Sequence, residues 1–155
     1  MPTDDSAKAK LKVLVRLEQD EDGYPPFAVE GLWASRHTSG ALILDNIPFF
    51  ARGVAPGDSL DVENQGSETW LKQVVSSGGA SVFRIRAATE ADLGRIREEL
   101  LDLGLPSEVD SKLLLVAVEV PINADIRPLL NYLVEGQESA RFDFEEAALR
   151  HALPE

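Results

Sequence analysis

The chain has 155 residues, with 15 lysines and arginines against 27 aspartates and glutamates, so its formal net charge is −12. That length suits one domain or two very small ones and is enough to bury a hydrophobic core. The charge argues against direct contact with nucleic acid or an anionic membrane, both of which require a basic surface. The absence of cysteine excludes disulfides, thiolate nucleophiles and zinc–thiolate sites. We therefore predict no nucleic-acid or membrane partner and no cofactor.

The amino-terminal residues and the apolar runs bear on location. Residues 1–9 are polar and acidic and do not have the pattern of a signal peptide, and the longest apolar run, 113–118, is far too short to cross a bilayer. We expect residues 1–9 to form a mobile leader and the protein to be cytoplasmic.

Residues 10–77 have the pattern of a β-rich subdomain. In 10–19 apolar side chains alternate with polar ones, which is typical of a half-buried strand, and the acidic residues 20–22 then predict a solvated turn. Further short strands are predicted over 27–35, 41–47, 59–63 and 69–76. Regularly spaced short strands with turn residues between them predict a small antiparallel β-barrel-like half.

Residues 78–155 change to alternating strands and helices. The glycine-rich segment 77–79 predicts a hairpin turn, and Thr89 with Asp92 has the spacing of a helix capping box. The predicted elements are strands over 81–87, 112–120 and 141–143, and helices over 89–103, 125–135 and 144–151. This order predicts a βαβα half related to the ferredoxin-like fold, with strands 81–87 and 112–120 as parallel neighbours. We expect an α+β protein whose two halves, 10–77 and 78–155, pack together as one compact unit.

No catalytic constellation stands out in the sequence. His37 and His151 lie far apart in polar segments, so we interpret both as exposed surface residues and predict no catalytic residue and no metal site. Glu119 interrupts an apolar strand. It is either a buried carboxylate with a raised pKa or, as we favour, part of a strand end that reaches solvent.

A partner- or ligand-binding surface is a further hypothesis, because exposed aromatic and arginine side chains are favoured interface anchors. Phe49 and Phe50 are adjacent and must face opposite ways in an extended chain, so one should enter the core and leave the other exposed. Arg84 and Arg86 share one strand face, where they either pair with acids of neighbouring strands or bind an anion. The candidate residues are Trp33, Asp45, Asn46, Phe49, Phe50, Arg52, Asp58, Arg84 and Arg86.

Four segments together resemble a bacterial family known as domain of unknown function 4265. They are V-L-V-R-L-E at 13–18, V-E-G-L-W-A at 29–34, D-N-I-P-F-F-A-R-G-V-A-P-G-D at 45–58 and S-G-G-A-S-V-F-R-I at 77–85. The resemblance supports the fold and a bacterial cytoplasmic setting and implies no established activity. Where the family's usual segment is similar to S-G-H-S-T-x-R, this chain has Gly79 and Ala80 in place of the histidine and serine, which argues against catalysis.

The leading hypothesis is a non-enzymatic, acidic regulator or inhibitor, of the immunity-protein or nuclease-inhibitor type, that occupies a basic surface on a protein partner. One alternative is an enzyme or small-ligand binder that uses Asp45, Asp58 or Glu119 with Arg52 or Arg84. Another is a structural interaction domain that forms a homodimer through its apolar 45–58 corner.

Overall fold

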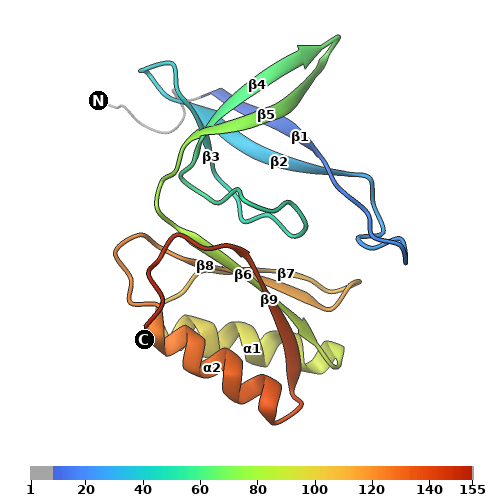
Figure 1. The fold of residues 1–155 in the computed structure, drawn as a ribbon, viewed down its shortest axis with the longest axis vertical. Coiled ribbons are helices and arrows are strands. Elements are labelled where there is room, and N and C mark those ends of the chain that lie inside the picture. Colours follow the sequence, from blue (N-terminus) through green and yellow to red (C-terminus); the bar gives the residue numbers. More distant parts are fainter. Residues whose placement is uncertain (1–8, 155) are drawn as a thin grey trace. The chain divides into compact units, whose positions relative to one another are not determined.

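The computed structural model describes residues 9–154, which fall into two compact units, Met1–Gly78 and Gly79–Glu155 (Figure 1). The predicted leader lies outside the described residues except for Ala9, which already belongs to the first strand. The predicted α+β class is confirmed, because the first unit is a barrel and the second is a sheet with two helices. Within residues 9–154, no helix combines the length and the apolar character needed to span a membrane.

The first unit is a closed barrel of five strands that follow one another in chain order. The strands are β1 (Ala9–Arg16), β2 (Val29–Arg36), β3 (Leu42–Leu44), β4 (Ser59–Gln65) and β5 (Glu68–Ser76). Consecutive strands are antiparallel, and β1 closes the barrel by a parallel pairing of Leu14 with Trp70 on β5. Alternation directs Val13 and Leu32 into the core and leaves Lys12 and Trp33 on the outer surface.

The second unit is a four-stranded sheet with both helices on one face (Figure 1). Its elements are β6 (Ser81–Ala87), α1 (Glu90–Asp102), β7 (Ser107–Asp110), β8 (Leu115–Val120), α2 (Arg127–Glu138) and β9 (Phe142–Ala148). The strand order β7-β8-β6-β9 and the chain order βαββαβ are those of the ferredoxin-like fold. The predicted relation to that fold is therefore confirmed.

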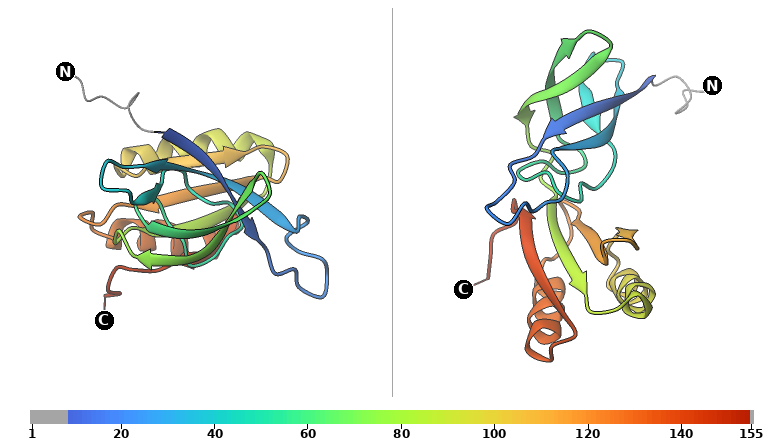
Figure 2. Two further views of the ribbon diagram at one scale, coloured as in Figure 1. Left: turned by 90° about the horizontal axis from the view of Figure 1, so that it is seen from above. Right: turned by 90° about the vertical axis from the view of Figure 1, so that its right-hand side faces the viewer.

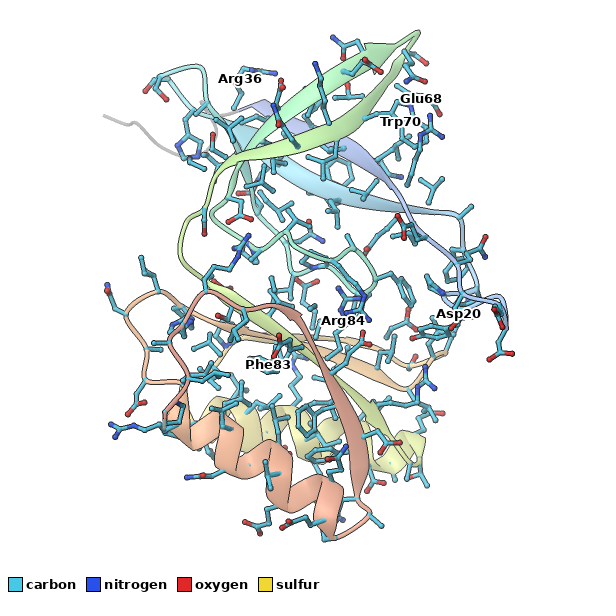
Figure 3. All side chains as sticks on the ribbon, in the orientation of Figure 1. Asp20, Arg36, Glu68, Trp70, Phe83 and Arg84 are labelled. Atoms are coloured by element: carbon cyan, nitrogen blue, oxygen red, sulfur yellow. The ribbon has the colours of Figure 1, made fainter. Side chains whose placement is uncertain are left out.

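The core of the second unit lies between the sheet and the helices. Phe83 and Ile85 of β6 pack there against Ile96 of α1 and Leu129 and Leu133 of α2. Figure 3 labels Phe83 and the next residue, Arg84, whose side chains leave opposite faces of β6. The predicted capping box is incomplete, because the Thr89 hydroxyl donates to the Asp92 carboxylate and makes no bond to the helix backbone.

Three local predictions for the second half are wrong. Strands β6 and β8 are antiparallel, because the unpredicted strand β7 follows α1 and pairs with β8. The predicted final helix over 144–151 is mostly strand β9, which pairs with β6. The segment 77–79 is not a hairpin turn, because β5 and β6 belong to different sheets.

Candidate functional site

The segment 45–58, which carried most of the candidate residues, holds the barrel backbone together. The Asp45 carboxylate accepts hydrogen bonds from Lys10 Nζ at 2.8 Å and from the Ser35 hydroxyl. Burial raises the pKa of Asp45, but the Lys10 and Ser35 hydrogen bonds outweigh it and keep this pKa below its ordinary value. The Asn46 side-chain oxygen accepts the Trp33 backbone N–H at 2.7 Å. These two side chains therefore extend the pairing of β2 beyond β3.

The other end of the segment depends on Asp58, which is fully buried. Its carboxylate accepts the backbone N–H of Ala55 at 2.9 Å and that of Gly78 at 3.0 Å. A side chain at Gly78 would overlap the backbone of Gly57, so only glycine fits this approach. Asp58 thus fixes the turn before β4 to the end of the barrel unit.

Glu30, which the sequence did not single out, organises the middle of the same segment. Its carboxylate accepts three consecutive backbone N–H groups, from Phe49 at 2.7 Å, Phe50 at 3.0 Å and Ala51 at 2.7 Å. In the sequence, the only sign of this role was an acidic residue in an alternating strand. That sign does not show that the carboxylate accepts backbone hydrogen bonds. Of the carboxylates described in and beside the 45–58 segment, Glu30 and Asp58 thus bind backbone N–H groups, and Asp45 binds side chains of β1 and β2.

The expectation for the two adjacent phenylalanines is wrong, because both Phe49 and Phe50 are half-buried and neither enters the core fully. The Phe50 ring lies edge-on to Tyr24, at 6.2 Å between centroids, and to Phe27, at 5.7 Å. The Phe27 side chain is itself 49% exposed. Arg52 is exposed in the same segment.

The connection between β1 and β2, residues 17–28, forms an exposed acidic hairpin. Glu18, Asp20, Glu21 and Asp22 are all exposed, and the hairpin contains no lysine or arginine. It extends beyond the barrel strands in both views of Figure 2, and Asp20 is labelled in Figure 3. One Asp20 carboxylate oxygen accepts the backbone N–H groups of Asp22 and Tyr24, both at 2.9 Å, so the turn is ordered by its own side chain. The sequence predicted this turn correctly but gave no reason to assign it a role.

A second exposed surface lies on the barrel wall and contains Trp33, a predicted interface residue that is 49% exposed. Lys12 is its direct partner across the β1–β2 ladder. Further along β1, the Arg16 guanidinium lies 4.1 Å from the centre of the Trp70 ring. We call these four residues, Lys12, Arg16, Trp33 and Trp70, the basic face.

In the second unit, Arg84 and Arg86 lie on the sheet face opposite the helices. Arg84 is 4% exposed and forms an ion pair with Glu145 on β9, with 3.7 Å between Nη1 and Oε2. Arg86 is exposed and faces Asp143 in the same ladder. The ion pair agrees with the interpretation that Arg84 pairs with an acid of a neighbouring strand.

Glu119 on β8 is half-buried, so it lies between the two alternatives: its strand end reaches solvent only in part. Burial raises the pKa of Glu119 above its ordinary value, and the nearby charge of Glu108 raises it further. This carboxylate therefore holds its proton more tightly than an ordinary glutamate does.

The interpretation of His151 as a plain surface residue is also wrong. Its Nδ1 lies 2.7 Å from the Ser81 hydroxyl and its Nε2 lies 2.9 Å from the Pro121 carbonyl oxygen. The Ser81 oxygen also accepts the backbone N–H groups of Arg150 and His151. With two N–H donors on its oxygen, the hydroxyl must donate to Nδ1, so this serine–histidine pair anchors the carboxyl-terminal segment. His37 is half-buried.

The described part of the chain, residues 9–154, contains no group of three or more histidine, aspartate and glutamate side chains placed to hold a metal ion. In this described part, charged side chains also bind one another at two further places. The first is Asp125 with Arg127, where the Arg127 hydrogen bonds lower the pKa of Asp125 to about 2. The second is Glu99, which accepts from Tyr132 and Arg141, both at 2.8 Å, and ties α1 to α2 and to the start of β9.

Fold and side chains together define a two-unit α+β protein whose exposed distinctive surfaces, an acidic hairpin and a basic face, both lie on the barrel. Residues 30–144 match a family model described as "Domain of unknown function (DUF4265)", so the chain belongs to that family and the predicted resemblance is confirmed. A comparison with curated proteins gave no match.

A solved structure shares the fold. It is titled "Novel crystal structure of a hypothetical protein from Neisseria gonorrhoeae" and is similar with a TM-score of 0.72 at 19% identity, over 94% of this chain and 97% of the other. At that identity the similarity establishes the arrangement of strands and helices and carries no function.

Proposed function

We propose that the protein is a non-catalytic regulator or inhibitor that occupies a basic surface on a partner protein, and that the acidic hairpin is the element that docks. The observation that carries the proposal is the make-up of this hairpin: four exposed acids, no base, and the half-exposed Phe27. A concentrated negative field accelerates association with a cationic surface, while an exposed aromatic supplies contact area.

The internal order of the hairpin favours binding. Asp20 fixes the turn, Gln19 donates to the Pro25 carbonyl oxygen at 3.0 Å, and Phe27 rests against Phe50. A pre-ordered element loses less conformational entropy when it docks. The alternative of an enzyme or small-ligand binder based on Asp45 or Asp58 has less support, because both carboxylates are engaged within the barrel unit. Asp45 accepts from the Lys10 and Ser35 side chains, and Asp58 accepts two backbone N–H groups.

The test is affinity capture from an extract of the native host at about 50 mM and about 300 mM salt, since screening weakens interactions between exposed charges. The hairpin variant combines Glu18→Gln, Glu21→Gln and Asp22→Asn with Phe27→Ala, and it keeps Asp20. The matched control carries Glu68→Gln, Glu135→Gln and Glu138→Gln, which change the net charge equally at exposed positions elsewhere.

We expect the wild type and the control to retain a basic protein at low salt and the hairpin variant to lose it. The proposal is wrong if no basic protein is captured at either salt concentration. Equal capture by the hairpin variant would also refute it, because docking would then not involve the hairpin.

A further inference from the structure

The basic face stands out because its two cations, Lys12 and Arg16, have no acidic partner among the residues that the structure describes. Among residues 9–154, no carboxylate lies within ion-pair distance of Lys12 or Arg16, whereas Lys10 on the same strand is paired with Asp45. Arg16 is held in place by stacking on Trp70, and Trp33 exposes half of its surface beside Lys12. Two cations and two tryptophans on one wall form a surface suited to an acidic, aromatic partner.

The chain itself carries a segment of that chemistry, the acidic hairpin with Phe27. We propose that two copies of this chain associate as a symmetric dimer in which the hairpin of each lies on the basic face of the other. The acidic hairpin joins β1 to β2, and these two strands carry Lys12, Arg16 and Trp33 of the basic face, so a single two-fold axis forms both contacts at once. An interface of this kind closes on itself and stops at two copies.

The β1–β2 ladder shows how the residues would meet. If the axis passes through the Arg16–Val29 pair, antiparallel alignment brings the tip acids Glu21 and Asp22 of one copy toward Lys12 of the other. The same alignment brings Phe27 toward Gly31, where the aliphatic part of the Lys12 side chain lies on the outer surface. Opposite charges therefore meet at both ends of the overlap.

A single-stranded nucleic acid is the weaker candidate for this face. Its affinity depends on the number of phosphates that the protein neutralises, and the two cations of the basic face must act against a net charge of −12. The hairpin of a second copy needs only two or three carboxylates to contact the cations of the basic face, and it also contributes the aromatic ring of Phe27. Because dimerisation covers the acidic hairpin, the dimer and the proposed complex with a basic partner exclude each other.

Sedimentation velocity of the full chain over a concentration series, at about 50 mM and about 500 mM salt, measures the association. Lys12 and Glu21 are both exposed, so Lys12→Glu and Glu21→Lys should leave the fold intact. We expect a dimer that dissociates in high salt and a dissociation constant raised about tenfold or more in each variant, because each change breaks two symmetry-related pairs. The matched control Glu68→Lys, an exposed reversal at the start of β5, should dimerise at least as well as the wild type.

Mixing the two variants provides the decisive measurement. A heterodimer of Lys12→Glu with Glu21→Lys has attractive pairs at both ends, so the mixture should dimerise more strongly than either variant alone. A monomer at every concentration, a dimer insensitive to both reversals, or no gain on mixing would each overturn the proposal. Salt-sensitive binding of a thymidine oligonucleotide that Lys12→Glu abolishes, without any dimer, would assign the face to nucleic acid instead. Since Lys12→Glu keeps the acidic hairpin, it should still capture a basic partner, so the two proposals can fail separately.

Discussion

Glu30 gives the sharpest test of how the barrel is built, because one carboxylate accepts three consecutive backbone N–H groups at 2.7–3.0 Å. Replacing it with alanine leaves all three donors in a half-buried segment without their acceptor. A hydrogen bond to a charged group contributes about 1.5–3 kcal/mol, but the three share one acceptor and water can replace part of the loss. We expect Glu30→Ala to lower the free energy of unfolding of the barrel by about 2–3 kcal/mol.

Glu30→Gln separates the charge from the shape. The glutamine oxygen can take the place of Oε1, which accepts from Phe50 and Ala51, but its NH₂ group would face the Phe49 N–H donor. We expect Glu30→Gln to lower the free energy of unfolding of the barrel by about 1–2 kcal/mol, which is less than the alanine substitution does.

Urea unfolding followed by tryptophan fluorescence reports on the barrel alone, because Trp33 and Trp70, the only tryptophans of the chain, both lie on its strands. Glu68→Gln, an exposed change on β5, serves as the control and should stay within about 0.5 kcal/mol of the wild type. If both Glu30 variants also stay within that range, the reasoning that the carboxylate holds the segment is wrong.

Three further predictions concern buried polar groups. Asp58→Asn keeps one acceptor for two backbone donors and should destabilise the barrel by about 2 kcal/mol in the same fluorescence assay, whereas an unchanged midpoint would contradict its role. Ser81→Ala removes the acceptor for two backbone N–H groups, so hydrogen exchange at the amide of His151 should accelerate at least tenfold; unchanged exchange would show that the anchor lies elsewhere. Burial and the charge of Glu108 raise the folded-state pKa of Glu119, so its ionisation costs stability as pH rises from its unfolded-state pKa through the raised value. Glu119→Gln should therefore stabilise the protein at neutral pH and lose that advantage in acid, as measured by calorimetry; an equal effect at both pH values would refute this.

Local side-chain patterns predicted most of the elements but not their partners. Alternation in 10–19 and 27–35 reflects a strand with one buried face, so β1 and β2 were predictable. Strand β7, Ser107–Asp110, has one apolar residue in four, and no periodicity can appear over that length. Its absence from the prediction made β8 seem to follow α1 directly, which produced the wrong parallel pairing.

The glycines before β6 show a different limit of local reasoning. Gly79 has a φ of +90°, which both a hairpin turn and a link between two units can require. At Gly78 the need for glycine comes from the Gly57 backbone, more than twenty residues earlier in the chain. Only the tertiary structure distinguishes these reasons. The sequence therefore placed the change between the two halves near this segment but wrongly described the segment itself as a hairpin turn.

For the candidate site, the sequence identified polar residues that could bind a ligand. It did not show which groups their oxygen atoms contact. Asp45, Asn46 and Asp58 have the oxygen atoms that a ligand site requires, yet each is engaged with the protein itself. Trp33 was selected as an interface residue from its residue type alone. Its ladder partner Lys12, and Arg16 further along the same strand, were not selected, because a linear pattern does not show the ladder register or the stacking of Arg16 on Trp70.

The family match covers residues 30–144, whereas the acidic hairpin and the two cations of the basic face precede residue 30. The motif at 45–58 lies within the matched residues and contributes to the barrel structure, since its polar side chains and Glu30 hold the backbone in place. A related chain could keep all of these bonds and carry a different β1–β2 hairpin with a different partner. Binding in this protein is accordingly expected to be decided by residues 12–27, and exchanging that hairpin alone should change what is bound without unfolding the barrel.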